Sequence, residues 1–402
     1  MKILIVTHYF PPETGAPQTR LGELARMWTE NGDEVTVLTG FPNHPTGVIT
    51  APYRRKARMV EPKDGYRIIR TWLYATPNER VIRKTLGHLS FMVSSVVLGI
   101  WSVGRTDVVI VSSPTMFSVP SAWFIAAVKR SRLVVEIRDL WPKAIVELGV
   151  LTSRKLIGAL EILERWCYRV ADLVVPVTAG LRDDIVARGV QASKVFVITN
   201  GVDTERFSIA QERADLKAQL GATNGELLAL YIGTHGMIYD LDAIIDAAEE
   251  LRDEPIRFAF VGEGVTKAGL MARVRDAALD NVMFHPSVDA AIVPDVMRSA
   301  DIGLIPLRDV PLVDSVLPVK MFEYMAAGRP IVAAIRGESE PILQLGGAVI
   351  VPPEDRTAFV EALRMLARDS AQRGERGEQG RAYVSANHSR RRLAETYRTL
   401  LT

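Results

Sequence analysis

The stretch Ser315–Pro330 reads SVLPVKMFEYMAAGRP, and it predicts a loop, a helix, a turn and a buried strand in that order. Pro318 suits a helix start, because the first turn does not use the N–H group that proline lacks. Gly328 and Pro330 are typical of a helix end. The apolar run Ile331–Ile335, IVAAI, then predicts the strand.

The predicted helix carries one charged pair, Lys320 and Glu323, on a single face. A lysine in the first turn, together with the free N–H groups and the helix dipole, favours binding of a phosphate. Glu323 lies one turn further on, where a carboxylate can accept hydrogen bonds from hydroxyls such as a ribose diol. An ordinary amphipathic helix with a solvated Lys–Glu pair explains the same residues, and this stretch alone leaves both interpretations open.

The segment Glu323–Pro330, EYMAAGRP, resembles the E-x-M-A-x-G-x-P run of the retaining glycosyltransferases of GT-B fold, family 4. In that family the glutamate is the second of an E-x7-E pair. Ser315 stands at the place of the first glutamate, and Asp314 is one residue out of register. The segment 315–324, SVLPVKMFEY, resembles the corresponding segment of the subgroup that builds bacterial surface polysaccharides, including colanic-acid and aminosugar transferases. The resemblance covers nearly the whole chain.

Apolar strand-like runs alternate with helical patterns in two successive sets, which predicts two doubly wound, Rossmann-like α/β domains. The sets meet at Asn200–Asp203, where Asn-Gly signals a turn. We therefore expect an N-terminal acceptor-binding domain over residues 1–199 and a C-terminal nucleotide-sugar domain over 200–385. The resemblance implies that the two domains face a cleft and that a helix over 386–402 returns to the first domain.

Twelve strands are predicted, six in each domain. They are Lys2–Thr7, Glu34–Thr39, Asp107–Ser112, Leu133–Ile137, Leu173–Val177 and Val195–Ile198, then Leu227–Ile232, Arg257–Val261, Val282–His285, Asp301–Pro306, Ile331–Ile335 and Ala348–Val351. Leu86–Gly104 lacks Asp, Glu, Lys and Arg, and we interpret it as a buried helix rather than a membrane span. Ser370–Gly380 is charged and contains glycine, so we expect an exposed segment.

The resemblance implies a set of donor-binding residues. They are Gly15, Gly233, Thr234, His235, Gly236, Gly262, Glu263, Gly264, Leu317, Lys320, Met321, Phe322 and Glu323. Thr234 stands where much of the family has an arginine, and no lysine follows it before Lys267. We therefore expect Lys320 to be the main cation for the diphosphate, with the Gly233–Gly236 loop as a substitute for the missing pair. For Gly15 and for this loop, a plain turn is the alternative.

Two further loops follow predicted strands, where ligands of open α/β sheets bind. Arg138-Asp139-Leu140-Trp141-Pro142 resembles the R-D-L-W-P loop of the polysaccharide subgroup, so Arg138 and Asp139 are predicted acceptor contacts. Asp139 joins Lys320 and Glu323 as a predicted catalytic residue, and a structural Arg–Asp pair is the alternative. His44, in the loop Phe41–Gly47, is a further acceptor candidate, with a structural histidine as the alternative.

Composition excludes several other classes of protein. The net charge of +2 over 402 residues gives no reason to expect nucleic acid as a partner. The single cysteine, Cys167, cannot form an internal disulfide, so we expect a reducing, cytoplasmic location. The six histidines show no metal-site spacing and no D-x-D stands in a suggestive loop, so no metal and no other cofactor is expected.

The segment Ala51–Lys84 is basic, with ten Lys or Arg residues against three acidic ones. It precedes the apolar stretch Leu86–Gly104. This combination suits peripheral contact of residues 52–104 with the cytoplasmic face of the inner membrane, where a lipid-linked acceptor would be reached. A solvated basic face beside a core helix is the alternative, and the sequence does not choose between them.

The sequence thus predicts a retaining glycosyltransferase that moves a sugar from a nucleoside-diphosphate sugar, with UDP as the expected nucleotide, to a lipid-linked or saccharide acceptor of surface-polysaccharide synthesis. An N-acetylated aminosugar is one candidate. Three rival functions stay open: a nucleotide-sugar epimerase of the same architecture, a non-catalytic nucleotide or sugar sensor, and an NAD-dependent oxidoreductase. The last lacks its G-x-G-x-x-G fingerprint, because only Gly15 follows the first strand.

Overall fold

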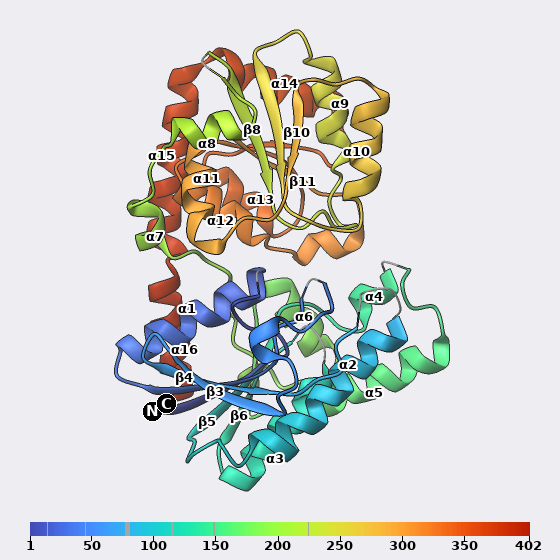
Figure 1. Cartoon of the computed structure of the whole chain (residues 1–402), viewed down its shortest axis with the longest axis vertical. Coiled ribbons are helices and arrows are strands. Elements are labelled where there is room, and N and C mark those ends of the chain that lie inside the picture. Colours follow the sequence, from blue (N-terminus) through green and yellow to red (C-terminus); the bar gives the residue numbers. More distant parts are fainter. Residues whose placement is uncertain (14, 45, 77–80, 114–115, 148, 224) are drawn as a thin grey trace. The chain divides into compact units, whose positions relative to one another are not determined.

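The computed structural model describes residues 1–402 except 14, 45, 77–80, 114–115, 148 and 224. The chain divides into two compact units. The first contains Met1–Thr199 together with Arg391–Thr402, and the second contains Asn200–Arg390 (Figure 1). Each unit is an open sheet with helices on its faces, as predicted for Rossmann-like α/β domains.

The first unit holds a seven-stranded sheet in the order β3-β4-β2-β1-β5-β6-β7. Its strands are β1 (Lys2–Val6), β2 (Glu34–Gly40), β3 (Arg58–Lys63), β4 (Tyr66–Thr71), β5 (Val108–Ser112), β6 (Arg132–Ile137) and β7 (Leu173–Pro176). Every neighbouring pair is parallel except β3 and β4. The apolar side chains of the central strands are buried on both faces, as parallel sheets require.

Helices cover this sheet on both sides. They are α1 (Ala16–Glu30), α2 (Val81–Ser94), α3 (Val119–Lys129), α4 (Lys143–Glu147), α5 (Arg154–Val170) and α6 (Ala179–Ala187), with a π-helical turn η2 (Ser95–Gly99) after α2 and short 3-10 turns η1 (Ala51–Tyr53), η3 (Met116–Ser118) and η4 (Ala192–Lys194). The last helix, α16 (Arg390–Leu401), packs here as well. Trp28 Nε1 donates to the carbonyl of Ala394 at 2.9 Å, and Arg398 pairs with Asp33. The predicted return of the C-terminal helix to the first domain is confirmed.

The second unit holds a six-stranded, wholly parallel sheet in the order β10-β9-β8-β11-β12-β13. Its strands are β8 (Leu227–Ile232), β9 (Ile256–Val261), β10 (Val282–His285), β11 (Ile302–Pro306), β12 (Ile331–Ala334) and β13 (Val349–Val351). Its helices are α7 (Thr204–Ser208), α8 (Ala214–Gln219), α9 (Asp242–Glu250), α10 (Lys267–Asp276), α11 (Val293–Ser299), α12 (Val319–Ala326), α13 (Ser339–Leu345), α14 (Arg356–Arg368) and α15 (Ser370–Asn387), with 3-10 turns η5 (Ala290–Ile292) and η6 (Pro311–Ser315).

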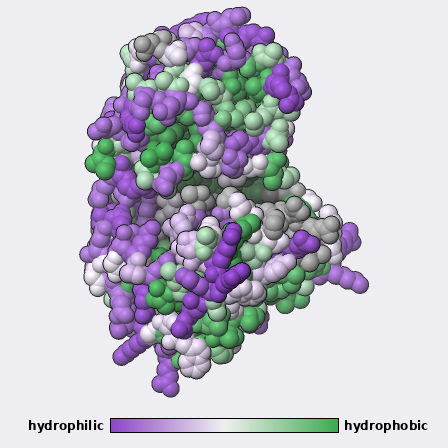
Figure 2. All heavy atoms as spheres, viewed as in Figure 1, coloured by the Kyte–Doolittle hydropathy of each residue, from purple (hydrophilic) through white to green (hydrophobic). Residues whose placement is uncertain are grey.

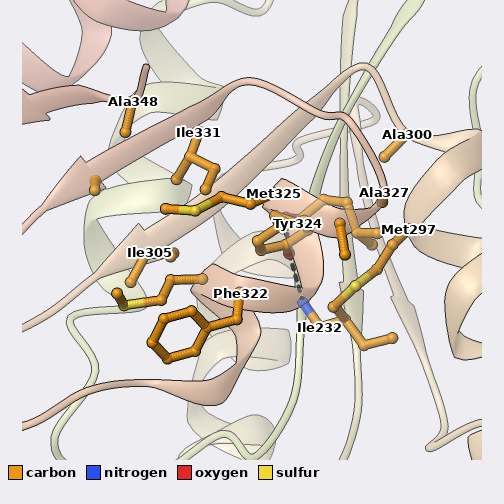
Figure 3. Close-up of a cluster of buried hydrophobic side chains, with 14 of the residues drawn as sticks. Ile232, Met297, Ala300, Ile305, Phe322, Tyr324, Met325, Ala327, Ile331 and Ala348 are labelled. Atoms are coloured by element: carbon orange, nitrogen blue, oxygen red, sulfur yellow. Dashed lines mark hydrogen bonds between the residues drawn. The ribbon is translucent and has the colours of Figure 1, made fainter. Parts of the chain in front are cut away.

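The signature helix α12 is anchored in the core of this second unit. Met321, Phe322 and Met325 are fully buried, and Tyr324 reaches across to β8 (Figure 3). The Tyr324 hydroxyl donates to the carbonyl of Leu230 at 2.6 Å and accepts from the Ile232 N–H at 3.3 Å. These contacts fix α12 against the sheet and so fix the position of Lys320.

The structure corrects the sequence predictions at three points. Strands β3 and β4 were not predicted in the basic segment, whereas the predicted strand Val195–Ile198 makes only a single bridge, from Val195 to Val174. Residues Ser370–Gly380 are largely exposed, as predicted, and they form the first part of α15, in which Gly377 and Gly380 are buried. The apolar stretch after residue 85 forms α2 and η2, yet it is only half-buried, because one side faces the sheet and the other faces solvent. Within the described residues, no helix has the length and apolar character needed to cross a membrane.

Candidate active site

Three neighbouring parallel strands of the second unit, β9, β8 and β11, deliver the predicted donor residues to one edge of the sheet. Gly233 follows β8 directly, Gly262 follows β9 directly, and the chain after β11 leads through η6 into α12. Ligands of open parallel sheets bind at the carboxyl ends of strands. The sequence order therefore brings the two glycine loops and the start of α12 together.

Lys320 is the unusual residue of this edge, because its ammonium group is buried without a hydrogen-bond partner among the described residues. The side chain is only 7% exposed. Its Nζ atom lies 3.6 Å from the ring centroid of Tyr231 and 4.0 Å from that of Tyr239. Burial holds the pKa of Lys320 well below its ordinary value of 10.5, while the nearby Glu323 carboxylate opposes this shift. Two aromatic faces thus stabilise a cation that an anionic ligand would stabilise better.

The glycines of the two loops allow the backbones to touch. A Cβ atom on Gly262 would lie 2.0 Å from the carbonyl oxygen of Gly233, and one on Gly264 would lie 2.2 Å from that of His235. A Cβ atom on Gly233 would lie 3.0 Å from Lys320 Nζ. Gly233 and Gly262 also have φ angles of +137° and +142°, which favour glycine. The loops therefore form one bare main-chain surface beside the Lys320 ammonium.

Part of the hydrogen-bonding capacity of the Gly233–Gly236 loop is already used. The Gly233 N–H donates to Val261 O and the His235 N–H donates to Glu263 O, both at 2.9 Å. A ligand could therefore use only the N–H groups of Thr234 and Gly236. The Thr234 side chain is exposed. The loop can contribute to an anion site as predicted, but with two amides rather than four.

The predicted role of the His235 side chain is corrected by its burial. The ring is 0% exposed and packs against Tyr231, Phe260 and Phe284, so it supports the loop from beneath. Burial, with the positive charges of Lys267 and Lys320, lowers the pKa of His235 to about 4, and the ring is neutral at pH 7. Neither ring nitrogen has a hydrogen-bond partner among the described residues.

Three other predicted donor residues are buried, and a fourth, Glu263, is exposed but already paired within the protein. Met321 and Phe322 are core residues, so only their main chains could approach a ligand. Leu317 is buried, and its carbonyl accepts a hydrogen bond from Asn200 Nδ2 at 3.1 Å. Glu263 pairs with Lys267 at 2.9 Å.

Lys267 does not replace the missing family lysine. Its ammonium also donates to the carbonyls of Gly262 and His285, so its hydrogen bonds are already made within the loop. Among the predicted donor residues that the structure describes, Lys320 is the cation whose ammonium makes no hydrogen bond within the protein. Glu323 is half-buried on the same helix, one turn further on.

The remaining predicted residues lie in the first unit. Gly15 is the N-cap of α1 with a φ of +154°, and a Cβ atom there would meet Gln18 Oε1 at 2.5 Å. His44 is exposed, and its main-chain N–H donates to the Glu13 carboxylate at 2.8 Å. Although the residue reaches solvent, partial desolvation of its ring by neighbouring groups, and then the charge of Lys84, lower the pKa of His44. Because it borders solvent, His44 can still contact a ligand.

Arg138 and Asp139 follow β6 directly. No ion pair joins them in the described part of the chain, and Arg138 Nε instead donates to the carbonyl of Ser113 at 2.5 Å. Asp139 is exposed at the end of the strand. The Arg138 guanidinium and the Asp139 carboxylate still attract each other electrostatically, so the structural Arg–Asp alternative stays open beside a contact of Asp139 with a ligand.

Sequence reasoning missed the aromatic residues that hold the key cation. Tyr231 lies inside the apolar run of β8 and Tyr239 lies in the loop after it, and neither stands out by spacing. Tyr231 also donates its hydroxyl to the carbonyl of Thr234 at 2.6 Å, which ties the loop to the strand. In the described ranges, no group of three or more His, Cys, Asp or Glu side chains is arranged to hold a metal ion.

Comparison with known proteins agrees with this geometry. Residues 15–201 match the glycosyl transferase 4-like domain, and residues 226–369 match the glycosyl transferases group 1 domain. The chain is 28% identical over 376 residues to the putative colanic acid biosynthesis glycosyl transferase WcaI of Escherichia coli, covering 90% of this chain and 91% of the relative. It is 30% identical over 207 residues to the putative teichuronic acid biosynthesis glycosyltransferase TuaH of Bacillus subtilis, covering half of each.

Solved structures share the fold over the full chain. Anabaena Alr3699/HepE, determined with UDP-glucose, has a TM-score of 0.73 at 15% identity and covers 100% of this chain and 99% of its own. WaaG, a glycosyltransferase of lipopolysaccharide biosynthesis, has a TM-score of 0.71 at 16% identity, with 99% of both chains covered. The GT-B fold predicted from the sequence is confirmed. The chain belongs to the GT-B glycosyltransferases, with a glycosyl transferase 4-like domain followed by a glycosyl transferases group 1 domain.

Proposed function

We propose that this protein transfers a sugar from a UDP-sugar to a lipid-linked or saccharide acceptor in bacterial surface-polysaccharide synthesis, with retention of configuration at the anomeric carbon. The reaction would take place in the cytoplasm, at the inner face of the membrane. An N-acetylated aminosugar is the first donor sugar to test.

The buried ammonium of Lys320 carries this proposal. A charged group without a hydrogen-bond partner is costly inside a protein, unless a ligand of opposite charge completes the site. A diphosphate at the start of α12 would meet this ammonium, the N–H groups of Thr234 and Gly236, and the dipole of the helix. These groups stabilise the charge that develops on the leaving UDP, which is the main electrostatic demand of glycosyl transfer.

The other catalytic roles follow from exposure and chemistry. Glu323 is half-buried one turn beyond Lys320, so its carboxylate can accept hydrogen bonds from donor hydroxyls. Asp139 is exposed at the end of β6, which suits a contact with the reacting sugars. We propose that protein groups alone neutralise the diphosphate, so that no metal is needed. Gly15, His44 and Arg138 remain proposed contacts.

The named relatives support the substrate class. The relative that matches over 90% of this chain is described as a colanic acid glycosyl transferase, and the partial match as a teichuronic acid one. HepE was determined with UDP and with UDP-glucose. These descriptions concern those proteins, and they favour UDP-sugars as the donors to test first for this one.

Contact with a membrane is the second part of the proposal. Arg54, Arg55 and Lys56 are exposed beside β3. Trp101, at the end of η2, is 84% exposed. Hydrophobic residues also reach the surface over α2, α3 and α5 (Figure 2). Each exposed cation near an anionic leaflet adds about 1 kcal/mol of attraction. Changing the three basic residues together to serine should reduce co-sedimentation with anionic vesicles, and unchanged co-sedimentation would refute this contact.

A transfer assay tests the main proposal. Purified protein is incubated with UDP-sugars and a lipid-linked acceptor, and the anomeric configuration of the product is read by NMR. Glu323→Gln should lower kcat/KM by at least ~100-fold, whereas the matched control Glu340→Gln, on the exposed surface of α13, should not. A product that forms without acceptor would indicate an epimerase. Binding of UDP without turnover of any donor would indicate a sensor, and an inverted product would refute retention.

A further inference from the structure

A second group of polar residues gathers at the carboxyl edge of the first unit. His8 follows β1, His44 follows β2 and Tyr74 follows β4, and these three strands are parallel neighbours. They line one hollow together with Tyr9 and with Arg83 and Lys84 from the first turn of α2. No acidic residue lies among the described residues that line it. The hollow is therefore suited to an anion.

The histidines of this hollow provide hydrogen bonds rather than charge. His8 and His88 have ring centroids 4.1 Å apart. Burial lowers the pKa of His88 to about 4 and holds that of His8 well below 6.5, so both rings are neutral at pH 7. His8 is 7% exposed, and its Nδ1 atom is buried without a hydrogen-bond partner in the described structure. The positive charge comes from Arg83 and Lys84, whose side chains are exposed at the rim.

An apolar groove begins where this hollow ends. Two serines of α2 tie the helix to the chain that leaves β4: Ser90 Oγ accepts from the Tyr74 N–H at 2.7 Å, and Ser94 Oγ donates to the carbonyl of Trp72. Gly87 allows the close approach, because a Cβ atom there would lie 3.0 Å from Tyr74 O. As a result, the side chains of Trp72 and Tyr74 stand beside the outer face of α2.

The groove between them is almost wholly apolar, with a volume of about 650 Å³. Its lining includes Trp72, Leu86, Leu89, Val93, Val97 and Tyr74. Val93 and Val97 are 55% and 58% exposed, which is unusual for valines on a helix that packs against a sheet. Tyr74 lines both the groove and the polar hollow, so the two meet at this side chain.

We propose that this groove and hollow form one binding site for a lipid phosphate, with the hydrocarbon chain along α2 and the phosphate at His8, His44 and Lys84. An apolar groove that runs into a cationic hollow, with no acidic residue among the hollow's described lining, matches an amphiphile with one anionic end. The volume lies within the range of small-molecule sites, roughly 300–1,000 Å³. Identification of this lipid as the acceptor rests on the proposed function, whereas the binding itself does not.

Calorimetry with farnesyl phosphate, kept below its micelle concentration, tests the site directly. We expect the intact protein to bind it at least tenfold more tightly than farnesol or inorganic phosphate. Val93→Asp should weaken binding at least tenfold, whereas Val128→Asp, at a valine of similar exposure on α3, should not. Lys84→Ala should weaken binding of farnesyl phosphate but not of farnesol, with Lys155→Ala on α5 as the control.

The outcomes separate the groove from the membrane surface and from the transfer reaction. Equal binding of farnesyl phosphate by the intact protein and by Val93→Asp would overturn the proposal. Loss of vesicle co-sedimentation in Val93→Asp, with farnesyl phosphate binding intact, would also overturn it and assign the groove to bulk bilayer contact. Farnesyl phosphate binding that depends on Val93 and Lys84, in a protein that transfers no sugar, would support the site and count against the proposed function alone.

Discussion

Replacement of Lys320 by methionine should make the ligand-free protein more stable while removing its affinity for UDP. Methionine keeps the length of the side chain beside Tyr231 and Tyr239 but removes the buried charge. Replacing buried charges with apolar side chains commonly stabilises proteins by about 1–4 kcal/mol, and the lost cation–π contacts offset roughly 1–2 kcal/mol of this. We therefore expect a net gain of about 1–2 kcal/mol.

The expected shift in melting temperature follows from this gain in free energy and from the length of the second unit. For a unit of this length, 1 kcal/mol corresponds to about 2–4 °C, so the variant should melt roughly 2–8 °C higher than the unmodified protein. UDP at a hundredfold excess over its Kd should stabilise the unmodified protein by about 2.7 kcal/mol. In Lys320→Met the stabilisation by UDP should vanish. Removing one partner of a buried charge pair, here the ammonium that faces the diphosphate, costs about 2–5 kcal/mol of binding free energy.

Thermal unfolding with and without UDP measures both effects in one experiment. The control is Lys217→Met, which removes a lysine of the same unit whose ammonium lies 2.7 Å from Asp301. It should leave the stabilisation by UDP unchanged, whatever its effect on the melting temperature of the ligand-free protein. A Lys320→Met protein that melts lower than the unmodified one, or that keeps the full UDP effect, would refute the reasoning.

Three further predictions concern the same edge of the sheet. Tyr324→Phe should lower the free energy of unfolding by about 1–3 kcal/mol in urea titrations, because it leaves the buried Ile232 N–H and Leu230 carbonyl without the hydroxyl; a change within ~0.5 kcal/mol would contradict this. Gly262→Ala should abolish UDP binding by forcing the loops apart, whereas Gly269→Ala on α10, where a Cβ atom has open space, should not. His235 has a folded pKa of about 4 against an ordinary 6.5, so its contribution to stability is present above pH 6.5 and is lost as the pH falls toward 4. Between pH 6.5 and 4, the free energy of unfolding should therefore fall by about 3 kcal/mol less for His235→Phe than for the unmodified protein. An equal fall in both proteins would show that the ring is not buried as described.

The signature helix could be predicted from sequence because its boundaries are set locally. Pro318 is the N-cap of α12 and Gly328 adopts a φ of +67° after it. The parallel strands were recognised for a similar reason, because burial on both faces leaves nearly continuous apolar runs. In such segments, the local conformation of the chain and its burial in the fold favour the same types of residue, so the sequence pattern predicts the structure.

The missed elements depend on contacts that no local pattern records. In β4, Arg70 is buried because it pairs with Glu61 of β3 and donates to the carbonyl of Pro11, so a strand was hidden inside a basic segment. In α15, the charged residues and glycines predicted an exposed segment but no helix, yet Gly377 is where the helix touches the main chain of Gly328, and a Cβ atom on Gly377 would lie 2.2 Å from the Gly328 carbonyl oxygen. Glycine there provides close packing rather than flexibility.

The candidate site likewise combines residues that the local sequence predicted with residues that only the fold brings together. Lys320 and Glu323 were found from their spacing on one helix, whereas the partners of Lys320 could not be. Tyr231 and Tyr239 come from β8 and the loop after it, and only the order of the strands brings them to the ammonium group. His235 was predicted to face the donor because it follows a strand, but the chain turns its ring into the core.

Calorimetric titration of the unmodified protein with UDP, GDP, ADP and NADH tests the central claim most directly. We predict that UDP binds with a Kd in the micromolar range or below, at least tenfold more tightly than the other three nucleotides, and that Lys320→Met abolishes the heat of binding. Binding of GDP in place of UDP would keep the transferase and change its donor. Binding of NADH alone, or of none of the four, would contradict the assignment of this edge as the site of a UDP-sugar.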